Sequence, residues 1–233
     1  MSSNTKIILC TYDKGGVGKT TLAVHITGII QKQTQGQILL VDCDPRPDAW
    51  IFFKGRRPQA GETRRTINNR LDVLWNPPRL SPPKFEPIRK SDLEVYDYIV
   101  IDTDSPPEDT VAMIRNNLPN IVLIPINTSQ KRSLKDLPVF LDTAADIEKR
   151  ANLEPGLNYN PKFIVVPLGI PEADAISKLN ETEEKPQFCQ VAPAMENLQD
   201  PISDALEKNS YIWDYPGCGE TLDYFINLLN LIT

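Results

Sequence analysis

The sequence has no apolar run long enough for a transmembrane helix, although 40% of its 233 residues are hydrophobic. A helix that crosses a bilayer needs about 20 consecutive apolar residues, so we expect no membrane-spanning segment. No apolar signal region precedes the first apolar segment at residue 7, and we therefore expect no secretory export. These absences predict a cytoplasmic protein.

Cysteine and histidine are scarce. The four cysteines lack the spacing of a metal site, and Cys10 and Cys43 fall in apolar segments where a reduced thiol acts as a small apolar filler. This usage indicates a reducing compartment. His25, the only histidine, has no partner at ligand spacing, so we expect a structural role for it.

What the sequence does contain is a glycine-rich loop between an apolar segment, residues 7–10, and a helical pattern that begins near Leu22. Glycines let successive backbone N–H groups converge on phosphate oxygens, and a helix N-terminus adds partial positive charge. In such a loop Lys19 would reach the β- and γ-phosphates, and the Thr20 hydroxyl would bind Mg²⁺. The predicted phosphate-binding residues are Lys14, Gly15, Gly16, Val17, Gly18, Lys19, Thr20 and Thr21.

This stretch, with Asp13 in place of the usual first glycine, resembles the deviant phosphate loop of the ParA/MinD family of P-loop ATPases. Two further family motifs follow in the expected order: Leu-Leu-Val-Asp-Cys-Asp-Pro at residues 39–45, and Tyr-Ile-Val-Ile-Asp at residues 98–102. The resemblance covers about the first 130 residues. It implies ATP and Mg²⁺ as ligands and an ATP-driven homodimer.

The resemblance also implies catalytic roles for Lys14, Lys19 and Asp44. Lys14 matches the lysine that crosses the dimer interface to the partner's ATP, and Asp44 matches the residue that orients the attacking water. A lysine that projects away from its own phosphates acts as a charge clamp in trans, as an arginine finger does. The alternative for Lys14 is a solvated side chain paired with Asp13.

Three strand-end aspartates are candidates for the metal site. Asp42 lies two residues before Asp44, on the same strand face, and Asp102 ends its strand after apolar residues, so both are expected near Mg²⁺ together with Thr20. The alternative is that they cap the following helices. Asp104 lies in an expansion of the family's Asp-x-Pro-Pro, and either helix capping or the outer shell of the metal would suit it.

Alternating apolar strands and helical patterns predict an α/β fold: a three-layer, doubly wound, mostly parallel sheet in one P-loop ATPase domain over residues 1–233. We expect a first helix that follows the glycine-rich loop and runs to about residue 35, with Gly36 as its stop. Further helices are expected over about 107–117, 133–151 and 221–232. Strands are expected near 6–11, 37–42, 96–102, 121–126, 163–166 and 188–192. The proline-rich segment at about 54–94 is expected to be mostly irregular, with one short strand at 71–75.

Charge is distributed unevenly along the chain. Residues 54–90 hold ten basic and three acidic side chains, so this segment carries +7 and the remainder −13, for a net charge of −6. Such asymmetry predicts a basic surface patch that meets DNA phosphates without reading sequence. Its candidate DNA-binding residues are Arg56, Arg57, Arg64 and Arg65. Pairing with acidic residues of the same chain, or contact with a cargo adaptor, is the alternative.

Two departures from the family bear on partners. No basic residue follows Pro193, where DNA-binding members carry an arginine, and residues 223–233 lack the Lys and Arg of a membrane-binding helix. We therefore expect the final helix to pack onto the sheet and to bind no membrane.

The resemblance to the ParA/MinD family implies an ATPase that positions a plasmid, a chromosome or a carboxysome-like body. ATP binding would drive dimerisation and non-specific DNA binding, with nucleoid association, and an adaptor protein would stimulate slow hydrolysis. Two other classes remain open: a P-loop ligase or synthetase that activates a small carboxylate, and a nucleotide-switched regulatory module without DNA contact.

Overall fold

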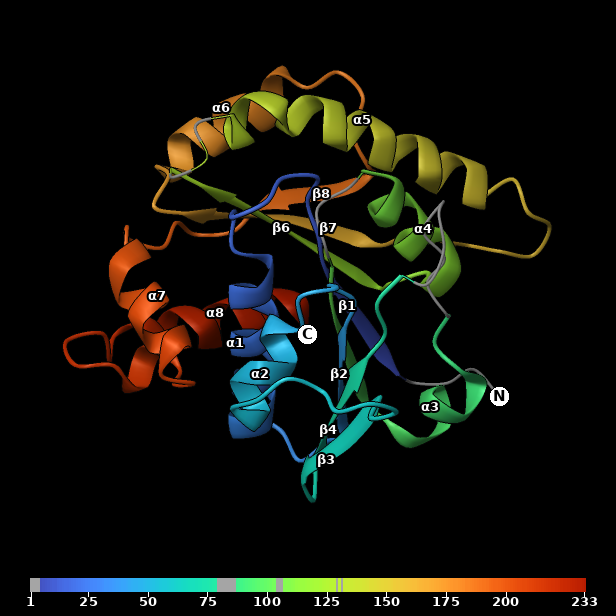
Figure 1. Cartoon of the computed structure of the whole chain (residues 1–233). Coiled ribbons are helices and arrows are strands. Elements are labelled where there is room, and N and C mark those ends of the chain that lie inside the picture. Colours follow the sequence, from blue (N-terminus) through green and yellow to red (C-terminus); the bar gives the residue numbers. More distant parts are fainter. Residues whose placement is uncertain (1–4, 79–86, 104–106, 129, 131) are drawn as a thin grey trace.

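The computed structural model describes residues 5–78, 87–103, 107–128, 130 and 132–233 (Figure 1). Within these ranges the strands are β1 Lys6–Cys10, β2 Ile38–Asp42, β3 Arg64–Asn68, β4 Leu71–Trp75, β5 Tyr98–Asp102, β6 Ile121–Asn127, β7 Lys162–Leu168 and β8 Phe188–Val191. The helices are α1 Lys19–Gln33, α2 Asp48–Lys54, α3 Lys90–Val95, α4 Pro107–Asn117, α5 Ser133–Ala151, α6 Glu172–Glu181, α7 Gln199–Glu207, the 3-10 turn η1 Ile212–Asp214 and α8 Thr221–Ile232.

The strands form one sheet in the order β3-β4-β2-β5-β1-β6-β7-β8. Neighbouring strands are parallel except for the antiparallel pair β3 and β4. The order reverses at β1, which pairs with β5 on one side and β6 on the other. Ligands of such sheets bind outside the carboxyl ends of the strands at this reversal. The predicted doubly wound α/β fold is confirmed.

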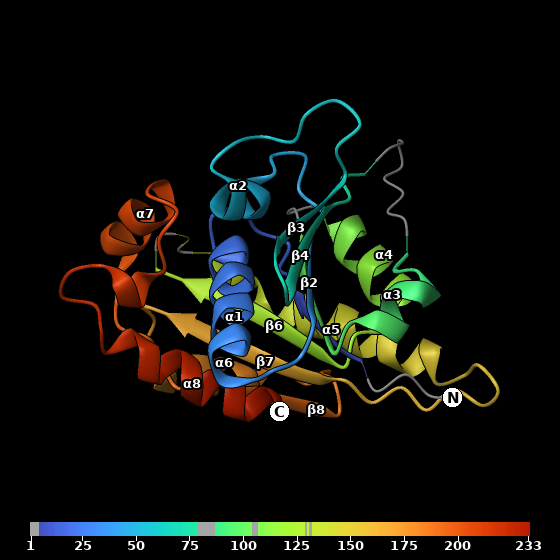
Figure 2. The same ribbon diagram turned by 90° about the horizontal axis from the view of Figure 1, so that it is seen from below.

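Helices cover both faces of the sheet, as Figures 1 and 2 show. Successive side chains of a strand point to opposite faces, so Ile8 and Cys10 of β1 join one core cluster and Ile7 and Leu9 join the other. The first cluster lies under α1, α2, α7 and α8, and the second under α4, α5 and α6. Two cores around one sheet make the predicted three layers.

The first helix ends earlier than the sequence predicts. α1 stops at Gln33, and Thr34 takes an extended conformation while its hydroxyl and N–H both donate to the Ile30 carbonyl. Gly36 therefore does not end the helix through a left-handed conformation. A glycine is needed there because a Cβ would come within 3.0 Å of the side chains of Asp97 and Tyr98.

The basic segment contains more regular structure than predicted. The strand at 71–75 is confirmed as β4, but Arg64–Asn68 also forms a strand, and α3 and part of α2 lie at its ends. β3 escapes recognition because it is an edge strand whose side chains are mostly exposed, so it lacks an apolar face. Helix α6 is missed for a similar reason: only Ala175 and Leu179 of it are buried.

The helices predicted at 133–151 and 221–232 are confirmed as α5 and α8. α5 continues through Pro138 without interruption. α8 buries Phe225, Leu228 and Ile232 in the core shared with α1, as expected for a packed helix. The C-terminal end of α8 lies beside the start of β1, where Lys6 Nζ donates to the backbone oxygens of Ile232 and Thr233, at 3.3 Å each.

Among the described residues, no helix is both long and apolar enough to cross a membrane.

Candidate functional site

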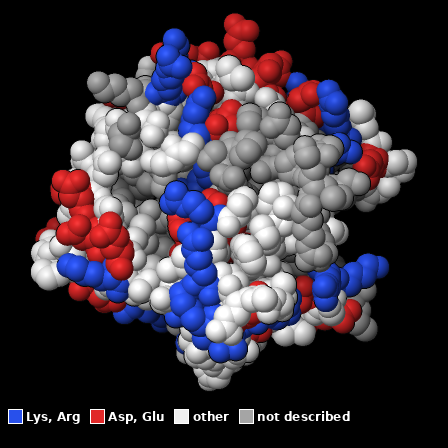
Figure 3. All heavy atoms as spheres, viewed as in Figure 1, with Lys and Arg blue, Asp and Glu red and all other residues white. Residues whose placement is uncertain are grey.

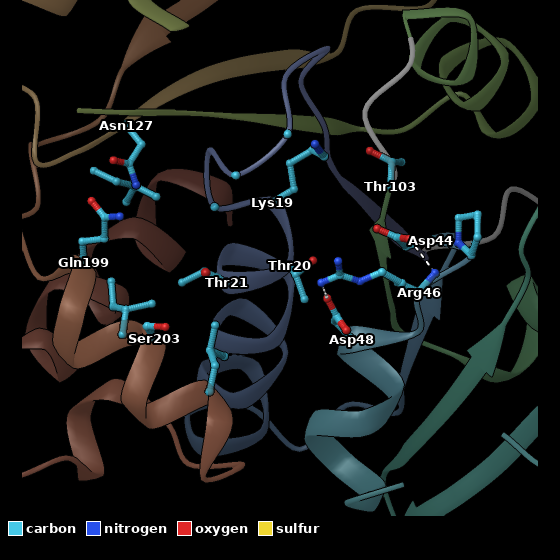
Figure 4. Close-up of a pocket in the computed structure, with 17 residues that line it drawn as sticks. Lys19, Thr20, Thr21, Asp44, Arg46, Asp48, Thr103, Asn127, Gln199 and Ser203 are labelled. Atoms are coloured by element: carbon cyan, nitrogen blue, oxygen red, sulfur yellow. Dashed lines mark hydrogen bonds and ion pairs between the residues drawn. The ribbon is translucent and has the colours of Figure 1, made fainter. Parts of the chain in front are cut away.

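A cavity of about 730 Å³ opens at the carboxyl ends of the central strands (Figure 4). A volume of this size is typical of sites for small molecules and cofactors. It lies between the β1–α1 loop, the β2–α2 loop and helix α7. The predicted site residues that line it are Gly15, Gly16, Gly18, Lys19, Thr20, Thr21 and Asp44. The other predicted site residues near it, Lys14, Val17, Asp42 and Asp102, lie around or beneath this lining.

Two loop positions require glycine. Gly16 and Gly18 have φ angles of +70° and +106°, in the left-handed region that L side chains rarely adopt. A Cβ on Gly18 would also lie 2.6 Å from Leu168 Cδ1. Gly18 precedes α1 and supplies no side-chain cap, so the first amides of the helix face the cavity without a side-chain acceptor at this position. Val17 is fully buried and anchors the loop in the core.

The ammonium group of Lys19 lies over the centre of the loop. Lys19 is 7% exposed, and its Nζ donates to the Lys14 carbonyl at 2.7 Å. A buried cation beside convergent amides creates a strongly positive pocket floor. Phosphate is the ligand that such a floor suits.

The side chain of Lys14 turns away from the cavity and pairs with α5. Its Nζ lies 2.9 Å from Asp136 Oδ2, and the two side chains are 35% and 31% exposed. The alternative partner considered from the sequence, Asp13, does not form this ion pair. Any other contact of the Lys14 ammonium group therefore requires separation from Asp136.

Asp42 contacts backbone amides and does not line the cavity. Its Oδ2 accepts the N–H of Trp50 at 2.9 Å, and its Oδ1 accepts the N–H of Asp44 at 3.1 Å. Both oxygens therefore hold the β2–α2 loop and the first turn of α2. The Asp42 carboxylate thus accepts amides at the start of α2, as the capping alternative expects, and its role toward Mg²⁺ stays a prediction.

Asp102 lies beneath the cavity and is fully buried. Within the described part of the chain, neither of its carboxylate oxygens forms a hydrogen bond of good geometry. Burial raises the pKa of Asp102 to about 7, although the nearby Thr20 hydroxyl and Lys19 ammonium act to lower it. A buried carboxylate without a proton or partner is costly, and a cation would stabilise it.

This donor set fits Mg²⁺. Among the described residues there is no cluster of three His, Cys, Asp or Glu side chains that would enclose a metal by itself. Mg²⁺ bound with a nucleotide needs no such cage, because one or two protein oxygens, water and phosphate oxygens complete its shell. Thr20 and the carboxylate of Asp102 are the residues that would hold it.

Asp44 lies in the lining, on the side of the cavity opposite α7 (Figure 4). Its Oδ1 accepts the N–H of Arg46 at 2.7 Å, and its carbonyl accepts Trp75 Nε1 at 3.0 Å. The loop thus fixes the carboxylate at the cavity wall. A fixed carboxylate in this position is suited to orient a water molecule.

The sequence does not predict a further group of lining residues, which come from the β2–α2 loop, from the ends of β5, β6 and β7 and from α7. They are Pro45, Arg46, Asp48, Thr103, Asn127, Leu168, Gln199, Ile202, Ser203 and Leu206. The strand-end residues Thr103, Asn127 and Leu168 could have been predicted from the order of the strands, because the carboxyl ends of parallel strands meet at one edge of the sheet. The four α7 residues follow no motif, and only the folded chain brings them to the cavity.

The predicted DNA-binding arginines are largely paired within the chain. Arg56 forms a bidentate pair with Glu62 at 2.8 and 3.0 Å, and Arg65 lies 3.3 Å from the same carboxylate. Arg64 donates to Asp92 Oδ1 at 2.8 Å. The hydrogen bond from Arg56, with that from the Gln59 N–H, lowers the pKa of Glu62 to about 2. The geometry favours the alternative of internal pairing for these three arginines.

Arg57 differs from the other three, because it is exposed and forms no ion pair with any described residue. Figure 3 shows a narrow band of Lys and Arg on this face, flanked by acidic side chains. Among the four candidate arginines, Arg57 is therefore the one available to an external anion.

His25 has the expected structural role. Its Nε2 accepts the N–H of Ile212 at 2.9 Å, its Nδ1 lies 2.7 Å from the Thr21 carbonyl, and its ring stacks on Phe225. Burial lowers its pKa to about 4, so the ring is neutral. Asp104 lies outside the described residues.

Comparisons with known proteins place these features in context. The model of one protein family, described as "CobQ/CobB/MinD/ParA nucleotide binding domain", matches residues 8–199. No curated protein sequence matches the chain.

Solved structures share its fold. A McdA variant from Cyanothece in complex with ATP is 17% identical, with a TM-score of 0.70 and 98% of both chains covered. MinD from Pyrococcus horikoshii OT3 with Mg-ADP is 16% identical, with a TM-score of 0.61 and 96% of this chain and 94% of MinD covered. A plasmid partition protein from Borrelia burgdorferi is 21% identical, with a TM-score of 0.52 and 95% and 98% covered.

Proposed function

Because the chain belongs to the CobQ/CobB/MinD/ParA family of nucleotide-binding domains, we propose that it is an ATPase that binds ATP with Mg²⁺ in the 730 Å³ cavity. The observation that carries this proposal is the convergence of Lys19, Thr20 and Asp44 on one cavity wall above the buried carboxylate of Asp102. Convergent phosphate, metal and water sites are what phosphoryl transfer requires.

The residues divide the chemistry between them. The loop amides and Lys19 bind the phosphates, and Thr20 with Asp102 holds Mg²⁺, which neutralises charge on the phosphate oxygens when bound. Asp44 orients the water that attacks the terminal phosphate. Catalysis then depends on positioning and charge neutralisation more than on covalent chemistry of the protein.

We further propose that ATP drives homodimerisation and that Lys14 then leaves Asp136 for the partner's nucleotide. The pair between Lys14 and Asp136 is half-buried but open to solvent, and it can exchange because solvent-accessible ion pairs contribute only about 0–1 kcal/mol. A triphosphate carries more negative charge than one carboxylate and so competes well for the ammonium group.

Cargo positioning is the biological role that we propose for this cycle, with an adaptor protein that stimulates slow hydrolysis. The similarity in fold to a plasmid partition protein supports this role. Non-specific DNA contact would fall first to Arg57, since Arg56, Arg64 and Arg65 are engaged with carboxylates. Two such patches in a dimer would bind more tightly than one through avidity.

A second candidate is a nucleotide-switched binding module without DNA contact. The internal pairing of three predicted DNA-binding arginines favours it. Both candidates share the ATP site and differ in the partner that the dimer binds.

The test is binding of non-specific duplex DNA by the full chain with ATP, with ADP and with AMPPNP, at two salt concentrations. Cargo positioning through DNA predicts binding that requires ATP or AMPPNP and weakens steeply with salt, because neutralised phosphates release counterions. ATP-dependent dimers that bind no DNA would support the binding module. Failure to bind any nucleotide would contradict both.

A further inference from the structure

A second cation, Arg46, reaches the nucleotide cavity from the β2–α2 loop. Figure 4 shows its side chain extending from this loop toward the start of α1, in the direction of Thr20. Its backbone N–H donates to Asp44 Oδ1, which fixes the point from which the side chain departs. The guanidinium group therefore starts from the same short loop that carries the proposed water-orienting carboxylate.

The present partner of Arg46 is a weak one. Its Nη2 lies 3.3 Å from Asp48 Oδ2 in a single contact, and the two side chains are 76% and 48% exposed. Solvent screens such a pair, and the geometry uses one donor of a group that has five. The guanidinium is thus held near the cavity but not committed to Asp48.

We propose that Arg46 is a further phosphate-binding residue of this site, supplied by the same chain as Lys19. This inference rests on the proposed function. When a nucleoside triphosphate binds, Arg46 exchanges Asp48 for oxygens of the terminal phosphate. A planar guanidinium binds phosphate through two parallel N–H donors, which gives both charge and direction.

The position of Arg46 assigns it to the terminal phosphate. Lys19 belongs to the loop proposed to bind the inner phosphates, whereas Arg46 comes from the neighbouring β2–α2 loop, beside Asp44. If Asp44 orients water toward the terminal phosphate, a cation on the same loop contacts the oxygens of that phosphate. Arg46 would then favour a triphosphate over a diphosphate, and it would neutralise charge that develops during transfer.

The test compares Arg46→Ala and Arg46→Lys with the wild type in calorimetric titrations with AMPPNP and with ADP. We expect Arg46→Ala to weaken AMPPNP binding by about tenfold or more, the usual effect of a lost charged hydrogen bond, and to change ADP binding by about twofold at most. Arg46→Lys should lie between, because an ammonium group retains charge but loses the paired donors.

Arg150→Ala is the matched control. Arg150 is also 76% exposed and pairs with an aspartate, Asp146, at 2.6 Å, but it lies on α5 away from the cavity. The Arg150→Ala variant should bind AMPPNP and ADP with the affinities of the wild type. Equal AMPPNP affinity for Arg46→Ala and the wild type, or an equal loss for AMPPNP and ADP, would overturn the proposal for Arg46 alone. A wild type that binds neither nucleotide would overturn the proposed function as well.

Discussion

Two buried aspartates at neighbouring strand ends have opposite surroundings. Asp42 and Asp102 are paired across β2 and β5, and both are 0% exposed. Backbone amides occupy the oxygens of Asp42, whereas those of Asp102 form no hydrogen bond of good geometry within the described ranges and have the Thr20 hydroxyl nearby. The first carboxylate stabilises a loop, and the second is available to a cation. Substitutions should separate these roles.

Asp102→Asn should change the pH dependence of stability. Burial raises the pKa of Asp102 to about 7, so the folded chain retains a proton that the unfolded chain releases above about pH 4. Stability from this group is present at low pH and is lost as pH rises toward 7. We expect Asp102→Asn without nucleotide to gain on the order of 2 kcal/mol above pH 7.

Urea unfolding at pH 5, 6, 7 and 8 measures this effect. The variant should show a shallower decline of the unfolding free energy across that window than the wild type. The burial of Asp42 also raises its pKa, so a residual decline should remain. Parallel curves for the two proteins would contradict the shifted pKa.

Asp42→Ala and Asp44→Ala should differ in kind. Loss of the Asp42 carboxylate leaves two buried amides without their acceptor, and we expect a loss of about 2 kcal/mol in the free energy of unfolding with nucleotide affinity retained. Asp44→Ala should bind ATP and fail to hydrolyse it. Thermal unfolding, ATP titration and phosphate release on both variants measure this, and hydrolysis by Asp44→Ala at the wild-type rate would move the water-orienting role elsewhere.

Lys19→Ala should abolish nucleotide binding, because the phosphates lose the point charge at the floor of the loop. Lys32→Ala is a suitable control, since Lys32 is an exposed residue in the last turn of the same helix. Titration with AMPPNP distinguishes the two. ATP binding by Lys19→Ala with wild-type affinity would contradict the assignment of the phosphate loop.

At the scale of elements, strands and helices with a buried stripe were predictable, and exposed elements were not. α5 and α8 follow from their apolar spacing, and β1, β2, β5 and β6 from nearly continuous apolar runs. β3 and α6 bury too few side chains for a periodic signal. The same limit applies to the site: the loop motifs identify one wall, whereas α7 joins it only through tertiary packing.

The β3–β4 hairpin offers a prediction at this scale. Arg64 on β3 pairs with Asp92 on α3, whose side chain is 7% exposed. Removal of the guanidinium leaves a nearly buried carboxylate without its partner, and we expect Arg64→Ala to lower the unfolding free energy by about 1–3 kcal/mol. Arg57→Ala, in an exposed position, should change stability by less than about 0.5 kcal/mol. Equal stability of the two variants in urea would contradict the structural role of Arg64.

At the scale of the whole molecule, the proposed ATP-driven dimer depends on Lys14. Lys14→Ala should still bind ATP but fail to dimerise, because the partner's nucleotide loses its clamp in trans. Asp136→Asn should have the reverse effect and promote ATP-dependent dimers, because it releases Lys14 from its 2.9 Å pair. Light scattering with AMPPNP measures both, and normal dimers of Lys14→Ala would remove Lys14 from the interface.

The contact of Lys6 with the backbone oxygens of Ile232 and Thr233 fixes the end of α8 beside the start of β1. Residue 6 begins β1 and the cavity lies beyond the end of β1, so the last residues of α8 lie at the opposite edge of the sheet from the cavity. A fluorescent reporter joined after Thr233 would therefore lie at the edge of the sheet opposite the cavity. It would leave the cavity and the Lys14 surface open, which makes that position the one from which the cycle can be watched in living cells.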